Sequence, residues 1–185
     1  MAEIKVNRAP FLTLWASVVA RRLGYDEDEA LTLGRAVAGL TAQSKGRRLG
    51  IYTQSPDEAR EKIKARRDEI GAETISLMNR TIPCLRTPDG LRALSKASPV
   101  DPESVRAYLA GRFKEDLAFI ESKLAELAAT YEPEELDQVA MDVYVKLRPN
   151  VPVGREGWGK AGLFETDRVD ALIRARVERR SCSLH

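Results

Sequence analysis

The sequence predicts a mainly all-α protein, a multi-helix bundle of about six to seven helices with at most one small β-hairpin near residues 74–85. Apolar residues recur at three- and four-residue steps over most of the chain, which is the period of one helix face. A proline or a capping residue precedes most of these runs. The composition, 43% hydrophobic and 31% charged, is typical of a globular domain with a solvated shell.

The first two helices are expected on either side of Gly24. One begins at Pro10 and carries a broad apolar face. The other begins at Asp26, with Glu29 three positions later at the spacing of a capping box. The segment 45–50 contains two glycines and three cations, as expected at the end of a helix. The buried stripe of the second helix is Ala30, Leu33, Val37 and Leu40.

The apolar run from Ala9 to Ala20 follows Lys5 and Arg8, so it also fits a secretory signal peptide. The helix interpretation is favoured because the run contains Trp15 and continues on a helical period. No stretch approaches the roughly 20 apolar residues of a membrane-spanning helix, so no membrane contact is expected. The two cysteines stand far apart, which disfavours a disulfide and fits a cytoplasmic location.

A third helix is expected from Ser55-Pro56, and its thin apolar stripe places it on the surface. The period becomes ambiguous between Thr74 and Leu85. A hairpin that turns at Asn79-Arg80 is favoured there over a continued helix. The tripeptide Thr87-Pro88-Asp89 predicts a short helix that carries two leucines, Leu91 and Leu94.

A long helix is expected from Asp101 to Leu127, with Gly111 as a candidate bend, and another from Pro133 to Leu147. The short connection between them predicts an antiparallel pair. Residues 1–150 are then one helical domain. Residues 151–180 would add an irregular segment, with Trp158 docked like a plug, and a last helix from Thr166. Residues 181–185 are expected to form a disordered tail.

The residue types exclude several chemistries. The single histidine is the final residue, His185, and a chain terminus cannot hold the geometry of a histidine-dependent catalytic or metal site. Phosphate-loop, dinucleotide and calcium-loop patterns do not occur. The acidic run Asp26 to Glu29 fans around a helix start, where it complements the macrodipole. We therefore expect no catalytic residue, no metal and no cofactor, although an enzyme that uses carboxylates or a bound cofactor stays an alternative.

Charge is distributed unevenly along the chain. Residues 45–96 hold twelve cations and seven anions, a net charge of +5, whereas the stretch from there to Pro149 carries −5 in a chain of total charge +2. Such asymmetry favours a partner of opposite charge. The candidate nucleic-acid or polyanion contacts are Lys45, Arg47, Arg48, Arg60, Lys64 and Arg67.

Two functional hypotheses follow from this pattern. The first is a non-enzymatic protein that binds nucleic acid or another polyanion through a basic patch, with little sequence specificity. The alternative is a helical interaction module or a self-associating scaffold, in which the positive stretch meets an acidic protein surface or the negative stretch of a second copy. An ordinary helix end at residues 45–50 and a solvated helix face would explain the same cations without any partner.

Residues 16–35 have the pattern of a helix-turn-helix motif, with small and apolar residues around a turn glycine. The start of the would-be recognition helix, however, holds the four carboxylates of residues 26–29, which DNA phosphates would repel. A helical hairpin that does not read bases is therefore favoured.

Four short segments carry a further resemblance: Leu12-Thr13-Leu14-Trp15, Ala30-Leu31-Thr32-Leu33-Gly34-Arg35-Ala36-Val37, Thr87-Pro88-Asp89-Gly90-Leu91-Arg92 and Gly157-Trp158-Gly159-Lys160. In these the chain resembles a small uncharacterised group of bacterial helical proteins. The resemblance implies a helical fold and no particular activity.

Overall fold

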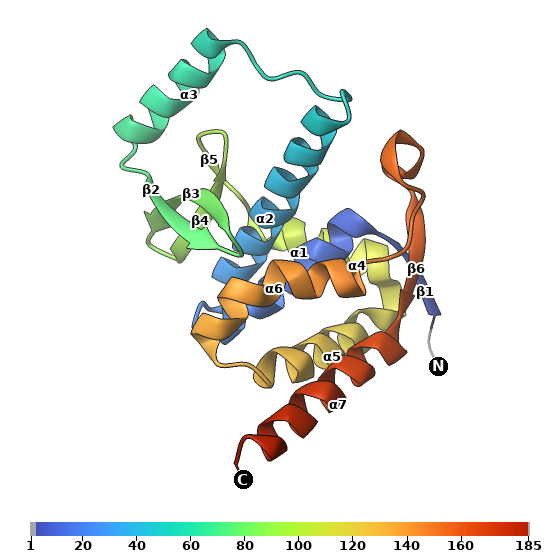
Figure 1. Ribbon diagram of the computed structural model, residues 1–185. Helices are drawn as coiled ribbons and strands as arrows, with labels where there is room; N and C mark the ends of the chain where they lie inside the picture. Colours follow the sequence, from blue (N-terminus) through green and yellow to red (C-terminus); the bar gives the residue numbers. More distant parts are fainter. Residues whose placement is uncertain (1–2, 185) are drawn as a thin grey trace.

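Two antiparallel β-sheets accompany the helices in the computed structural model, which describes residues 3–184 (Figure 1). One sheet pairs β1 (Glu3–Asn7) with β6 (Ala161–Glu165). The other has four strands in chain order: β2 (Glu73–Leu77), β3 (Arg80–Thr87), β4 (Gly90–Ser95) and β5 (Ser98–Pro99). The prediction of an all-α bundle with at most one hairpin is therefore wrong, and the fold is α+β.

The α-helices agree more closely with the sequence pattern. Their bounds are α1 (Arg8–Arg22), α2 (Glu27–Arg48), α3 (Asp57–Glu69), α4 (Pro102–Phe113), α5 (Leu117–Ala129), α6 (Pro133–Leu147) and α7 (Thr166–Cys182). Short 3-10 turns occupy Lys114–Asp116 and Gly154–Gly157. No helix among residues 3–184 is both long enough and apolar enough to cross a membrane.

The expected hairpin is present, and its turn lies one residue earlier than predicted. Met78 and Asn79 form the loop between β2 and β3, and their φ angles of 51° and 62° are those of a type I′ turn. Such a turn matches the right-handed twist of the two strands. The hairpin is joined to α6 because the Met78 amide donates a hydrogen bond to Asp137 Oδ1 at 2.8 Å.

The short helix expected after Thr87 is wrong, because β4 occupies those residues. Leu91 to Leu94 are all buried, so β4 is covered on both faces and shows no alternation of polar and apolar residues. The three-residue spacing of Leu91 and Leu94 therefore resembled one face of a helix. The covering element on one side is α2, whose Thr32 hydroxyl accepts a hydrogen bond from the Ala93 amide at 3.1 Å.

The long helix expected from Asp101 is divided into α4 and α5. The break falls at Lys114, whose φ is 52°, and not at Gly111. The predicted antiparallel pair is also absent from the main packing contacts of the described residues: α5 packs on α1 and α7, whereas α6 packs on α1. The shared partner α1 thus replaces the expected direct pairing.

The C-terminal part of the chain returns to the N-terminal strand. In the β1–β6 pair, Ile4 lies opposite Phe164 and Val6 lies opposite Gly162, so residues expected to be irregular form a strand. The helix α7 continues to Cys182, two residues into the segment 181–185 that was expected to form the tail. His185 lies outside the described residues. Cys84 and Cys182 are both free, as expected.

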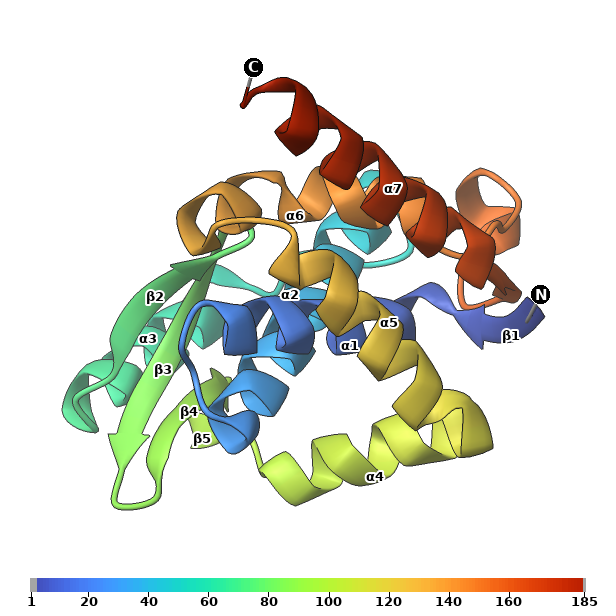
Figure 2. The same cartoon turned by 90° about the horizontal axis from the view of Figure 1, so that it is seen from below.

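Helix α1 forms the centre of the core. Every residue from Pro10 to Ala20 is buried, and Figure 2 shows α1 in the middle, with the four-stranded sheet on one side and β1 and α7 toward the other. The indole of Trp15 donates a hydrogen bond to the Ala140 carbonyl of α6 at 2.9 Å. A helix buried on every side has no polar face, so the periodicity of its apolar residues is weak.

The acidic start of α2 has a structural role. Asp26 and Glu29 form the predicted capping box, and the second Glu29 oxygen accepts a hydrogen bond from the Leu91 amide of β4 at 2.8 Å. Asp28 accepts a hydrogen bond from Arg106 of α4 at 2.9 Å. The turn that would enter a DNA groove in a helix-turn-helix motif is therefore held by β4 and α4.

Gly34 sets the distance between α1 and α2. A Cβ atom at this position would lie 2.5 Å from the Thr13 carbonyl oxygen and 2.8 Å from the Ser17 amide nitrogen. We expect Gly34→Ala to destabilise the protein by about 1–3 kcal/mol, the usual cost of overpacking, in denaturant unfolding experiments.

Gly39 provides the matched control, because it lies in the same helix and a Cβ there meets no atom within 4 Å. Gly39→Ala should raise the free energy of unfolding by about 0.5–1 kcal/mol, since alanine favours a helix over glycine. Equal effects of the two substitutions would show that Gly34 does not set the approach of the helices.

Candidate functional site

The six predicted binding residues do not form one patch. Figure 1 shows α3 apart from the last turn of α2, with the segment 49–56 between them. Arg60 and Lys64 are exposed on α3, whereas Arg67 is half-buried and donates a hydrogen bond to the Lys96 carbonyl at 2.5 Å. The remaining three, Lys45, Arg47 and Arg48, lie at the end of α2, where Arg47 and Arg48 are exposed.

Much of the positive stretch is neutralised by neighbouring acids. Arg60 pairs with Asp57 one helical turn away, and Arg86 Nε lies 2.8 Å from Glu73 across the β2–β3 pair. The helix α3 contains five cations and five anions, so it carries no net charge. The sequence imbalance therefore does not survive as one electropositive surface on α3.

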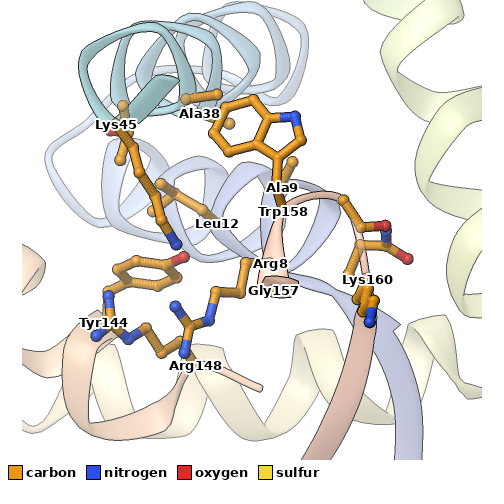
Figure 3. A pocket seen from close by; sticks show the side chains of 14 residues that line it. Arg8, Ala9, Leu12, Ala38, Lys45, Tyr144, Arg148, Gly157, Trp158 and Lys160 are labelled. Carbon is orange, nitrogen blue, oxygen red and sulfur yellow. The ribbon is translucent and has the colours of Figure 1, made fainter. Parts of the chain in front are cut away.

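Lys45 instead lines a pocket of about 220 Å³ between separate parts of the chain. The walls come from the junction of β1 and α1, from the middle and end of α2, from the end of α6 and from the segment that follows the second 3-10 turn (Figure 3). The lining residues include Arg8, Leu12, Ala38, Lys45, Tyr144, Arg148, Trp158 and Lys160.

Four cations line this pocket, and no carboxylate does. They are Arg8, Lys45, Arg148 and Lys160. Within residues 3–184, none of the four takes part in a salt bridge. The Nε of Arg8 donates a hydrogen bond to the Pro149 carbonyl at 2.9 Å, which orients its guanidinium and leaves the terminal nitrogens for another acceptor. Cations gathered without a carboxylate attract an anion.

The pKa values of two pocket residues reflect this arrangement. Burial, followed by the positive charges of Arg8, Arg148 and Arg48, lowers the pKa of Lys45 below its ordinary value of 10.5. Burial and the charge of Arg148 likewise lower the pKa of Arg8. Both shifts show that the protein environment disfavours the charged forms of Lys45 and Arg8. A bound anion would stabilise these charged forms by pairing with them.

Tyr144 adds a hydroxyl donor beside the cations. Its side chain is only 5% exposed, and its hydroxyl has no hydrogen-bond partner among the residues that the structure describes. Burial raises the pKa of Tyr144 to about 12, so the hydroxyl keeps its proton at neutral pH. The hydroxyl is not among the fully buried atoms that lack a partner, so it is accessible from the pocket that Tyr144 lines and can donate to a ligand there.

The first turn of α1 borders the same pocket. Its first-turn residues include no acid, and the N-cap residue Asn7 makes no capping hydrogen bond with its side chain. That side chain instead donates a hydrogen bond to the Gly159 carbonyl at 2.5 Å. The positive end of the α1 macrodipole therefore adds to the field of the cations.

Trp158 forms part of the apolar wall. Its ring meets Tyr52 edge-to-face, with centroids 5.5 Å apart, and both rings lie over Gly46 of α2, where a Cβ would stand 2.4 Å from the Tyr52 ring. Arg155 holds the same segment by donating to the carbonyls of Leu49 and Gly50. Trp158 is half-buried: one side of its ring is docked on Tyr52 and Gly46, and the ring also lines the pocket.

Sequence reasoning identified only Lys45 among these cations. Arg8, Arg148 and Lys160 lie outside the basic stretch, and single-chain charge counting cannot place four distant segments together. The dipeptide Arg148-Pro149 does carry a usable signal. The proline predicts the end of a helix, and an arginine just before it is expected near the last helix carbonyls.

Comparisons with protein-family models, with curated proteins and with solved structures give no match for this chain. Within residues 3–184, no group of three or more histidine, cysteine or acidic side chains is placed to hold a metal ion.

A site built for binding should reduce the stability of the free protein. We expect Arg148→Gln to raise the free energy of unfolding by a few tenths to about 1 kcal/mol, because it removes repulsion from Arg8 and Lys45 in a partly exposed cluster. Thermal unfolding at low salt would measure the change. Lys146→Gln, at an exposed position of α6, is the control and should have little effect. A clear loss of stability in Arg148→Gln would show that Arg148 supports the fold.

Proposed function

We propose that the protein binds a small anionic ligand in the pocket between α1, α2, α6 and the segment 157–160, which contains Trp158. The observation that carries this proposal is the convergence of four cations with no carboxylate among the lining residues. The Tyr144 hydroxyl and the first turn of α1 supply further donors that suit an anion.

The lining supports binding more than catalysis. It contains no carboxylate, thiol or imidazole that would act as a general base or a nucleophile at neutral pH. A volume of about 220 Å³ is below the range of about 300–1,000 Å³ usual for sites that take drug-sized ligands. The proposed ligand is therefore a small molecule that carries a phosphate, sulfate or carboxylate group.

Sulfate titration at constant ionic strength tests the proposal, with the dissociation constant measured by isothermal titration calorimetry. Wild type should bind sulfate, and Arg148→Gln should weaken binding by about 10- to 100-fold, the usual effect of losing a charge-assisted hydrogen bond. Arg47→Gln is the matched control, since Arg47 is exposed outside the pocket. The proposal fails if sulfate, phosphate and acetate all leave the wild type unaffected, or if Arg47→Gln weakens binding as much as Arg148→Gln.

Anion binding should also depend on pH through Lys45. Its ammonium form attracts the anion, so affinity for sulfate should fall as pH rises through a pKa that lies below 10.5 in the free protein. Lys45→Arg should remove this dependence, because a guanidinium stays protonated throughout the range. Sulfate is a suitable probe because its own charge is constant there. A pH profile that is the same in both proteins would show that Lys45 does not contact the anion.

Binding of nucleic acid with little sequence specificity is a second proposal. It is supported by Arg47 and Arg48, which are exposed on the same helix end as Lys45. A polyanion with one phosphate in the pocket could therefore place its next phosphates near these two side chains. Single-stranded DNA binding should then weaken in Arg47→Gln/Arg48→Gln and fall steeply with salt. The matched control is Arg60→Gln/Lys64→Gln on α3. No binding of oligonucleotides at low salt would end this second proposal.

A further inference from the structure

We infer that the ligand is a phosphomonoester that carries a planar aromatic ring. Its phosphate would bind among Arg8, Lys45 and Arg148, and its ring would pack against Trp158. This inference rests on the proposed anion site and adds the chemical class of the molecule that occupies it.

The charged part of the pocket suits a dianion better than a carboxylate. Figure 3 shows the Lys45 ammonium beside the Tyr144 hydroxyl and the Arg8 guanidinium below it, with the Arg148 guanidinium toward the other end of the Tyr144 ring. A carboxylate offers two oxygens and one negative charge. A phosphomonoester offers three terminal oxygens and about −1.5 to −2 charges at neutral pH, which matches three cations and a hydroxyl donor.

The donor types agree with this assignment. Guanidinium groups bind phosphate through two parallel hydrogen bonds, and Arg8 and Arg148 provide two such groups from different elements. The first amides of α1 lie at the same end of the pocket, because Arg8 and Ala9 both line it. A helix start combined with arginines and a lysine is a common arrangement of phosphate sites in proteins.

The remaining part of the pocket is apolar and flat-sided. Trp158 lies across the pocket from Tyr144 and Arg148 in Figure 3, with Leu12 and Ala38 near it. The contact with Tyr52 and the close approach to Gly46 fix the indole before any ligand arrives. A preorganised aromatic ring beside small side chains leaves space for another planar ring, and stacking of this kind contributes about 1–3 kcal/mol.

The volume limits the size of the ring system. A cavity of about 150 Å³ accommodates one benzene ring in an engineered protein core, so about 220 Å³ suits a phosphate with a single ring or with part of a larger one that projects into solvent. Lys160 is exposed at the rim near Trp158, where it would meet a polar substituent of the ring or solvent.

Matched pairs of phosphomonoesters test the inference by calorimetry. Phenyl phosphate is compared with glycerol phosphate, and adenosine monophosphate with ribose 5-phosphate. In each pair the phosphate is shared, and only one member has a ring. For at least one pair, the aromatic member should bind about 5- to 150-fold more tightly to the wild-type protein, the equivalent of 1–3 kcal/mol. Which pair shows the larger gain distinguishes a simple aromatic phosphate from a nucleotide.

The variant Trp158→Leu should bring the aromatic and non-aromatic members of each pair to nearly equal affinity, whereas Trp158→Phe should retain part of the difference. Intrinsic fluorescence gives a second readout, because Trp15 is fully buried with its indole bonded to Ala140 and Trp158 lines the pocket. Fluorescence should change with phenyl phosphate in the wild type, and the change should be lost in Trp158→Leu.

The outcomes separate the two proposals. If the aromatic and non-aromatic members of both pairs bind equally well, the inference about the ring is overturned while the anion site stands. If the gain persists in Trp158→Leu, the ring lies elsewhere and the inference is again overturned. If no phosphate compound or sulfate binds to the wild type, the proposed function itself is wrong.

Discussion

The burial of α1 on every side is the constraint on which the rest of the structure depends. Because residues Pro10 to Ala20 have no solvent-facing side, α2, α5 and α6 must all pack against them, and Gly34 has to bring α2 within backbone contact of Thr13 and Ser17. The N-terminus of such a helix still has unpaired amides. The N-terminus of α1 lies beside Lys45 and Arg148 because α2 and α6 both pack against α1.

The pocket is therefore a consequence of how the core elements end. Three of its four cations come from the first residue of α1, the last turn of α2 and the residue after α6. The return of the chain through Trp158 to β6 covers one side and adds the fourth, Lys160. Burial of cations beside other cations opposes folding, as the lowered pKa values of Arg8 and Lys45 indicate. A protein can retain this loss of folding stability when the same cations are needed to bind an anion.

The helices could be predicted from the sequence more readily than the strands, for physical reasons. Capping boxes and proline starts act locally, so the beginning of α2 at Asp26 and of α6 at Pro133 was readable. The strand β4 is covered on both faces and shows no period of two, and the strand partner of β1 is β6, more than 150 residues away. Lys45 was identified from local charge. Arg8 and Arg148 were not, because their proximity is created by tertiary packing around α1.

The most direct test of the central claim is an amide and indole NMR titration of the wild-type protein with sulfate. The pocket account predicts that the largest shift changes occur at the backbone amides of Arg8 and Ala9 and at the indole N–H of Trp158, with α3 unaffected. Shift changes centred on α3 or spread evenly over exposed cations, with Arg8, Ala9 and Trp158 unchanged, would contradict it.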